Sequence, residues 1–95
     1  MTTPHVTVKL RGRNGAPDRE IELIREDFAA LRQIATSAPE IRHIERAFRR
    51  LQARRLAGHV FRLDDVGFPH AFAELTADGE QALTQDPFAM RGGAA

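Results

Sequence analysis

Arginine is the residue type with the clearest chemical potential in this chain, and it is concentrated in one short segment. Of the 14 basic residues, 13 are arginines, and six of these lie between residues 39 and 58. On a helix, Ile41, Ile44, Phe48 and Leu51 would share one apolar face. The arginines that fall on the other side of that helix are Arg42, Arg46, Arg49, Arg50 and Arg54. The segment therefore predicts a helix that buries one face and presents guanidinium groups on the other.

A helix of this kind is suited to a phosphate-bearing partner. A planar, permanently charged guanidinium binds phosphate through two hydrogen bonds and also pairs with guanine edges in the major groove, so the pattern predicts binding to double-stranded DNA. Two other interpretations stay open. The partner could be an acidic protein surface, or the helix could simply be solvated, with Glu45 and Arg49 paired one turn apart.

The charge of the chain is unevenly distributed. Residues 39–58 carry a net charge of +4 and the remaining residues carry −3, which together give the formal net charge of +1. A basic helix on a mildly acidic body favours a polyanionic partner. It also allows self-association through oppositely charged faces.

Other site chemistries lack the residues that they need. The chain has no cysteine, and Ser37 is its single serine. The four histidines have no metal-ligand spacing, and no glycine-rich phosphate loop follows a predicted strand. The sequence also shows no clustered pair of residues that could act as general acid and general base. We therefore expect no enzymatic activity, no cofactor and no bound metal.

Length and composition indicate one globular domain. The chain has 95 residues, of which 42% are hydrophobic and 28% are charged. No apolar run approaches the roughly 20 residues of a membrane helix, and residues 1–5 lack the features of a secretory signal. Because a cysteine-free chain suits a reducing compartment, we expect a cytoplasmic protein that does not contact a membrane.

A second pattern follows the arginine segment. A basic, leucine-containing stretch leads to Gly58, two short apolar segments come next, and the chain then reads Leu75-Thr76-Ala77-Asp78-Gly79-Glu80-Gln81-Ala82-Leu83. Over about residues 48–83 the chain resembles winged-helix transcription regulators of the MarR and PadR kind. In these regulators a wing of two strands follows the recognition helix, and a Leu-Thr-x-x-Gly-x-x-x-Leu-like segment opens the next helix. The resemblance implies a homodimeric DNA-binding regulator of transcription.

The resemblance also implies roles for single residues. The exposed N-terminal half of the recognition helix would contact bases through Arg42, Arg46 and Arg49. Contacts to the DNA backbone or minor groove would come from Arg50 and, in the first wing strand, from Arg62; Arg54 completes the set of nucleic-acid-binding candidates. Asp64 and Asp65 at the wing tip would repel phosphate, which argues against a deeply inserted wing.

A helix-turn-helix needs a positioning helix before its recognition helix. Either residues 28–36 form this helix or it is absent, in which case only the second half of the chain is similar to a winged helix. A second function therefore stays open. The chain could be a protein-interaction or adaptor module that uses the basic helix, or a hairpin edge, on an acidic protein partner.

The N-terminal half predicts a hairpin and a helix. Residues 5–12 alternate like a half-buried strand, and Asn14-Gly15 is a strong turn signal. Residues 19–25 fit either the second strand of this hairpin, which we favour, or the start of a helix capped by Asp18. In the hairpin alternative, Asp27 caps a helix over residues 28–36.

The C-terminal half predicts a helix, a wing-like hairpin and a short helix. Ser37 and Glu40 fit a capping box for a helix that runs to about Leu56, with Gly58 as its stop. Residues 59–63 and 71–75 predict two strands. Thr76 then caps a helix over about residues 77–85, in which Gly79 permits close packing on the sheet.

These elements predict a small α+β, winged-helix-like domain over residues 5–86, with flexible ends at 1–4 and 87–95. Phe68 and Phe72 are expected in the core, with an exposed interface patch as the alternative, and Phe88 is expected to pack back on the domain or against a partner. The N-terminal hairpin could serve as a dimerisation edge. The predicted core consists of Val6, Val8, Leu10, Leu31, Ile34, Ile41, Ile44, Phe48, Leu51, Val60, Leu75 and Leu83.

Overall fold

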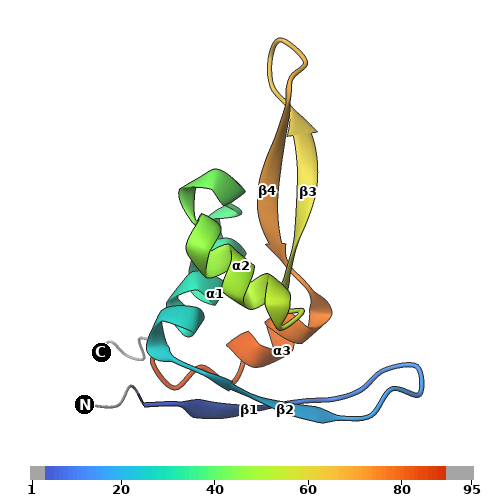
Figure 1. Cartoon of the computed structure of the whole chain (residues 1–95), viewed down its shortest axis with the longest axis vertical. Helices are drawn as coiled ribbons and strands as arrows, with labels where there is room; N and C mark the ends of the chain where they lie inside the picture. The colour runs from blue at the N-terminus through green and yellow to red at the C-terminus, as the bar shows by residue number, and fades with distance from the viewer. Residues whose placement is uncertain (1–3, 90–95) are drawn as a thin grey trace.

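The computed structural model describes residues 4–89, which form a small α+β fold of two antiparallel hairpins and three α-helices (Figure 1). The expected fold class is therefore confirmed. Most of the expected flexible ends, residues 1–3 and 90–95, lie outside the described residues. In chain order the elements are β1 (Val6–Leu10), β2 (Arg19–Leu23), α1 (Arg25–Ser37), the 3₁₀ turn η1 (Ile41–His43), α2 (Glu45–Ala53), β3 (Ala57–Leu63), β4 (Pro69–Leu75) and α3 (Ala77–Leu83).

The first hairpin confirms the strand interpretation for residues 19–23, whereas Arg25, the last residue of the predicted strand, already belongs to α1. β1 pairs with β2 in antiparallel register, and alternate residues of β1, Val8 and Leu10, are buried. Asn14 and Gly15 both have positive φ, 53° and 83°, so the predicted turn forms at this pair. In Figure 1 this hairpin lies across the end of the helices, beside α3.

α1 begins at Arg25, before the predicted start at residue 28. The carboxylate of Asp27 accepts a hydrogen bond from the backbone N–H of Ile24 at 2.9 Å, so it closes the first turn of α1 and does not cap a later start. Ser37 is the last residue of α1, and its hydroxyl donates to the carbonyl of Gln33. The predicted capping box of Ser37 is therefore wrong.

The single long helix predicted over residues 39–56 is also wrong. Its first part is the 3₁₀ turn η1, and Ile44 leaves the helical region with φ −135° and ψ 30° before α2 begins. The reason is a contact distant in sequence. The carbonyl of Pro39 accepts a hydrogen bond from β4, and Glu40 forms a β-bridge with Phe72. Pairing with β4 holds this segment extended, so the helix starts later.

The second hairpin is longer than the predicted strands 59–63 and 71–75, with seven residues in each strand. Gly58 lies inside β3 and does not terminate a helix. Arg55, with φ 63°, occupies the left-handed position that follows α2. Figure 1 shows that the hairpin projects away from the three helices.

α3 begins as predicted. The hydroxyl of Thr76 accepts a hydrogen bond from the backbone N–H of Gly79 at 3.0 Å. Gly79 is required by packing, because a Cβ atom at this position would lie 2.0 Å from the carbonyl oxygen of Leu56. The helix ends at Leu83, two residues before the predicted end.

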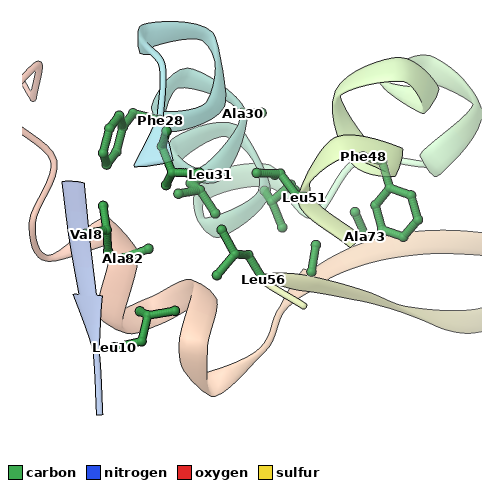
Figure 2. Packing of buried hydrophobic residues seen from close by; sticks show 13 residues of the cluster. Val8, Leu10, Phe28, Ala30, Leu31, Phe48, Leu51, Leu56, Ala73 and Ala82 are labelled. Atoms are coloured by element: carbon green, nitrogen blue, oxygen red, sulfur yellow. The ribbon is translucent and has the colours of Figure 1, made fainter. Parts of the chain in front are cut away.

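The core lies between the helices and the bases of both hairpins (Figure 2). The predicted core residues that are buried are Val8, Leu10, Leu31, Ile34, Phe48 and Leu51. Those that are only partly buried against it are Val6, Ile41, Ile44, Leu75 and Leu83. Val60 lies on the opposite face of β3 from the buried Ala57, so its prediction is wrong. Phe28 is buried, as expected from its place on the apolar stripe of the helix predicted over residues 28–36, and the buried residues that the sequence analysis missed include Leu23 and Leu56.

Phe88, beyond α3, packs back on the domain, which is one of the two alternatives expected for it. Its ring centroid lies 5.8 Å from that of Phe28, and the guanidinium of Arg25 lies 4.6 Å from its ring. These contacts attach the end of the described chain to α1.

Candidate nucleic-acid interface

α2 is held on the core by one side. Phe48 and Leu51 are its buried residues, and the remainder of this nine-residue helix is exposed or partly exposed. Since residues three apart lie on the same side of a helix, the arginines of α2 sit around the rest of its surface. The packing of α2 therefore confirms the predicted apolar side for these two residues.

Three of the predicted arginines are exposed at the start of this region. Arg42 lies in η1, and its Nε is 3.4 Å from the carboxylate of Glu40. Arg49 lies 2.6 Å from the carboxylate of Glu45, and the side chains of Arg42 and Arg49 are each 71% exposed. Arg46 has no ion pair with any residue between 4 and 89. The pair of Arg49 with Glu45 is exposed and contributes about 0–1 kcal/mol, so a phosphate group can displace this carboxylate. Glu40 is only 19% exposed and also contacts His70, so the partner of Arg42 is held more firmly.

Arg50 has a structural contact instead. Its Nη2 lies 2.8 Å from Oδ1 of Asp27, whose side chain is only 3% exposed, while the other oxygen of this carboxylate holds the N–H of Ile24. The pair joins α2 to the first turn of α1. Arg46 borders the same hollow, beside Glu26, but Arg50 occupies the carboxylate. Sequence reasoning named Asp27 among the carboxylates that could pair with the arginines, which would favour a structural role, but it could not identify Arg50 as the partner because only the packing of α1 on α2 brings the two together.

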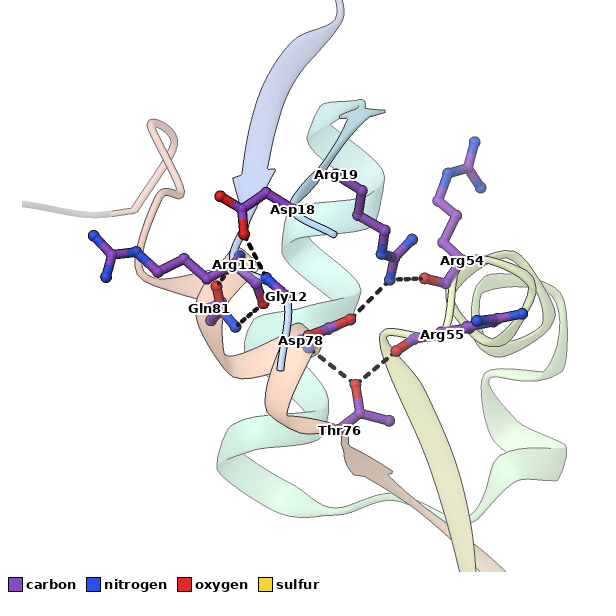
Figure 3. A network of polar contacts seen from close by, with 10 residues as sticks. Arg11, Gly12, Asp18, Arg19, Arg54, Arg55, Thr76, Asp78 and Gln81 are labelled. Atoms are coloured by element: carbon purple, nitrogen blue, oxygen red, sulfur yellow. Dashed lines mark hydrogen bonds and ion pairs between the residues drawn. The ribbon is translucent and has the colours of Figure 1, made fainter. Parts of the chain in front are cut away.

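Arg54 belongs to a polar network at the end of α2 (Figure 3). Its Nη1 donates to the carbonyl of Arg50 at 3.2 Å, and its own carbonyl accepts a hydrogen bond from Arg19 at 2.8 Å. Arg19 also lies 2.9 Å from Asp78 of α3. The network joins β2, α2 and α3, so the main chain of Arg54 is fixed within the fold.

Arg62 is separated from the arginines of α2. Its guanidinium carbon lies 5.3 Å from the ring centroid of Phe72, which is half-buried beneath it. Alternation along β3 places Arg62 on the opposite face from Ala57, which is buried in the core. The structure therefore puts Arg62 on the hairpin face that turns away from the core.

A histidine braces the turn of the second hairpin. Nδ1 of His70 lies 3.0 Å from Glu40, and its Nε2 lies 2.8 Å from Asp64. The bond to Asp64, followed by the bond to Glu40, raises the pKa of His70 above its ordinary value. The bond from His70, followed by that from the backbone N–H of Phe68, lowers the pKa of Asp64. The carboxylate of Asp64 is thus engaged inside the turn, which reduces its expected repulsion of phosphate.

The tip of this hairpin is apolar and exposed. The exposed fractions are 62% for Phe61, 70% for Leu63, 75% for Val66 and 65% for Phe68. The core position predicted for Phe68 is wrong because the hairpin extends beyond the helices that could have covered it (Figure 1). Exposed apolar area of this kind is typical of an interaction surface. The signal for it in the sequence is a run of large apolar residues around an Asp-Asp and Gly-containing turn.

No family model, curated protein or solved structure matches this chain. The winged-helix resemblance therefore stays a prediction, as do the expected absence of catalysis and of a cofactor. Among residues 4–89 no group of three or more His, Cys, Asp or Glu residues could hold a metal ion. The two ring nitrogens of His70 contact carboxylates on different sides of the ring. The ring and the two carboxylates therefore do not face a common point at which a metal ion could bind. No helix in this part of the chain is long and apolar enough to cross a membrane.

Proposed function

We propose that this chain is a small DNA-binding protein that regulates transcription in the cytoplasm, and that Arg42, Arg46 and Arg49 contact the duplex. The observation that carries the proposal is the exposure of these three guanidinium groups around the start of α2. None of them is paired with a carboxylate as deeply buried as that of Asp27, although Glu40, the partner of Arg42, is only 19% exposed. Their hydrogen-bonding groups are thus available for phosphates and for the edges of bases.

The order of the elements supports a winged-helix mode of docking. The bridge at Glu40 joins the segment after α1 to the hairpin, and α1, which covers the residues expected for a positioning helix, contacts α2. A helix of nine residues is about 14 Å long, which suits a short insertion in the major groove. Arg50 and Arg54 orient this helix through their contacts within the fold, and Arg62 lies on the wing.

Binding should depend on salt in proportion to the phosphates contacted. The logarithm of the affinity falls linearly with the logarithm of the salt concentration, and each phosphate neutralised adds about 0.9 to the steepness of this slope. We expect the double variant Arg46→Gln, Arg49→Gln to bind more weakly and to lower the salt slope by about 2. Fluorescence anisotropy with a labelled duplex over a salt series measures both quantities.

The control removes one charge of the same type elsewhere, against two in the double variant. Arg13 is exposed in the turn of the first hairpin, so the variant Arg13→Gln changes the net charge without touching η1 or α2. We expect its affinity and salt slope to stay close to those of the original chain. Failure of the original chain to retard any duplex at low salt would refute the proposal, as would equal weakening by Arg13→Gln.

A second candidate function is supported by the apolar tip of the hairpin. A protein-interaction module would use the arginines of α2 on an acidic protein, next to an apolar contact through Phe61 or Phe68. This alternative predicts a protein that co-purifies with the chain after nuclease treatment and is lost in the Arg46→Gln, Arg49→Gln variant. DNA binding predicts that nuclease treatment releases whatever is retained.

A further inference from the structure

The edges of the two hairpins differ in how they are protected. An exposed strand edge presents unpaired N–H and C=O groups to which another strand can bind. The edge of β1 is covered by α3 and the turn after it, because the side-chain amide of Gln85, two residues beyond α3, accepts from the N–H of Lys9 and donates to its carbonyl, at 3.1 and 2.8 Å. Gln81 does the same for Arg11, as Figure 3 shows. This edge is therefore closed to other strands.

Two further edges are also protected. On β4, the N–H of Ala73 donates to the carbonyl of Pro39 at 2.9 Å, next to the bridge at Glu40. On β2, Glu20 and Glu22 pair with residues of β1 whose main-chain groups point away from the hairpin. The main-chain groups of Glu20 and Glu22 therefore lie on the outer edge of β2. Two exposed carboxylates at this edge would repel a second copy of the same strand.

The edge of β3 has no such protection. At the two ends of the hairpin, the N–H of Asp64 donates to Phe68 and the N–H of Thr76 donates to Leu56. Because hydrogen-bonded pairs alternate in an antiparallel ladder, the even-numbered residues of β3 bond to β4. The main-chain groups of the odd-numbered residues point outward, and within residues 4–89 they have no hydrogen-bond partner. Beyond the buried Ala57 at the base of the strand, these residues are His59, Phe61 and Leu63.

The side chains of the same three residues form an exposed row of one imidazole and two apolar groups. Residues two apart share a face of a strand, and the rings of His59 and Phe61 lie 5.1 Å apart in an edge-to-face arrangement. Phe61 and Leu63 are both more than half exposed. In Figure 1, β3 is the outer strand of the projecting hairpin, with β4 between it and η1. Nothing in the described fold would obstruct a strand that approaches this edge.

We propose that β3 pairs in antiparallel fashion with β3 of a second copy of this chain, around a two-fold axis at Phe61. In this register Phe61 faces Phe61 of the second copy, and His59 faces Leu63. All outward main-chain groups of the three residues then find partners, which is the self-complementarity that a two-fold interface requires. The contact stays within the exposed part of the strand, away from the buried Ala57.

Charge supports the second copy as the occupant. In this register Arg62 faces Val60 of the second copy, whereas a register centred on Arg62 would place two guanidinium groups opposite each other. The acidic turn at Asp64 and Asp65 comes to lie near the exposed Arg55 at the base of the second copy's β3. The acidic tip of one copy thus meets a basic part of the other.

The test compares oligomeric state with amide protection in the absence of DNA, so its outcome is independent of the proposed function. We expect sedimentation equilibrium to show a dimer that dissociates on dilution. Hydrogen exchange followed by NMR should show that the amides of His59, Phe61 and Leu63 become protected as the dimer forms. A monomer at every concentration would overturn the proposal, and so would a dimer in which these amides stay unprotected.

Charge variants test the register. Phe61→Lys places two lysines opposite each other at the axis, and Phe61→Glu places two glutamates there, so each variant alone should be monomeric. An equimolar mixture of the two should recover the dimer, which shows that neither variant is merely unfolded. The matched control is Phe68→Lys, which changes an equally exposed phenylalanine outside the paired strand and should remain dimeric. Absence of recovery in the mixture, or loss of the dimer in the control, would overturn the proposed pairing.

Discussion

Arg50 is predicted to stabilise the fold, in contrast to the exposed arginine next to it. The change Arg50→Gln removes the cation that lies 2.8 Å from Asp27 and leaves a carboxylate that is 3% exposed without its partner. The change Arg49→Gln removes a cation of the same type from the neighbouring position, where its partner Glu45 is more than half exposed. The two variants have the same composition and net charge, so a difference between them reports on burial alone.

The expected size follows from the exposure of the two partners. Removing one member of a fully buried ion pair costs about 3–5 kcal/mol, because the remaining charge is left uncompensated. The side chain of Arg50 is 43% exposed and water can replace part of its contact, so we expect a loss of about 2 kcal/mol. For a domain of this size that lowers the melting temperature by about 8–16 °C. Arg49→Gln should cost less than about 0.5 kcal/mol.

Thermal unfolding followed by circular dichroism measures these differences, and a double-mutant cycle with Asp27→Asn isolates the pair. Asp27→Asn keeps an oxygen for the N–H of Ile24 and leaves Arg50 free to be hydrated, so it should cost less than Arg50→Gln. The double variant has no unpaired buried charge and should cost less than the sum of the single changes. Equal melting temperatures for Arg50→Gln and Arg49→Gln, or strictly additive costs in the cycle, would refute the structural role of Arg50.

Two further predictions concern the close contact of α3 and the braced turn. Gly79→Ala should cost about 3 kcal/mol in urea unfolding because its Cβ would lie 2.0 Å from the carbonyl oxygen of Leu56, whereas Gly58→Ala, with open space around it, should be tolerated. The contribution of His70 to the stability of the fold is fully present below about pH 6.5 and is lost as the pH rises through its raised pKa. The contribution of Asp64 is present above about pH 4 and is lost as the pH falls through its lowered pKa. The turn should therefore be most stable between about pH 4 and 6.5, and an NMR titration that places the His70 midpoint at or below its ordinary value would contradict this.

Features with local causes could be predicted from the sequence. The first hairpin depends on the turn at Asn14 and Gly15, and α3 depends on the hydroxyl of Thr76 and on the small size of Gly79. In each of these the residue type determines the conformation of its own neighbourhood. The apolar side of α2 at Phe48 was also predicted, because helical periodicity does not depend on where the helix begins.

Features with causes distant in sequence could not be predicted in the same way. The extended conformation at Glu40 results from pairing with Phe72, and it overrides a plausible helix start after Ser37. The role of Arg50 depends on Asp27, which lies in a different helix. A pattern read along one helix identifies a face rich in arginine, but it cannot identify which of these arginines another element has already bound.

The distinction changes how the charge segregation of this chain should be interpreted. Residues 39–58 carry a net charge of +4, but the fold uses the guanidinium of Arg50 to neutralise a buried carboxylate, and that of Arg54 donates to its own helix. The surface that remains for a polyanion is smaller than the sequence suggests and consists of η1 and the first turns of α2, with the exposed Arg55 beyond the end of α2. A contact surface of this size on one copy offers few phosphate contacts. Doubling it by pairing β3 with a second copy would raise the affinity without any new arginine, because the second contact becomes intramolecular. DNA binding by the Phe61→Lys monomer should therefore be weaker than that of the Phe68→Lys control, which carries the same added charge.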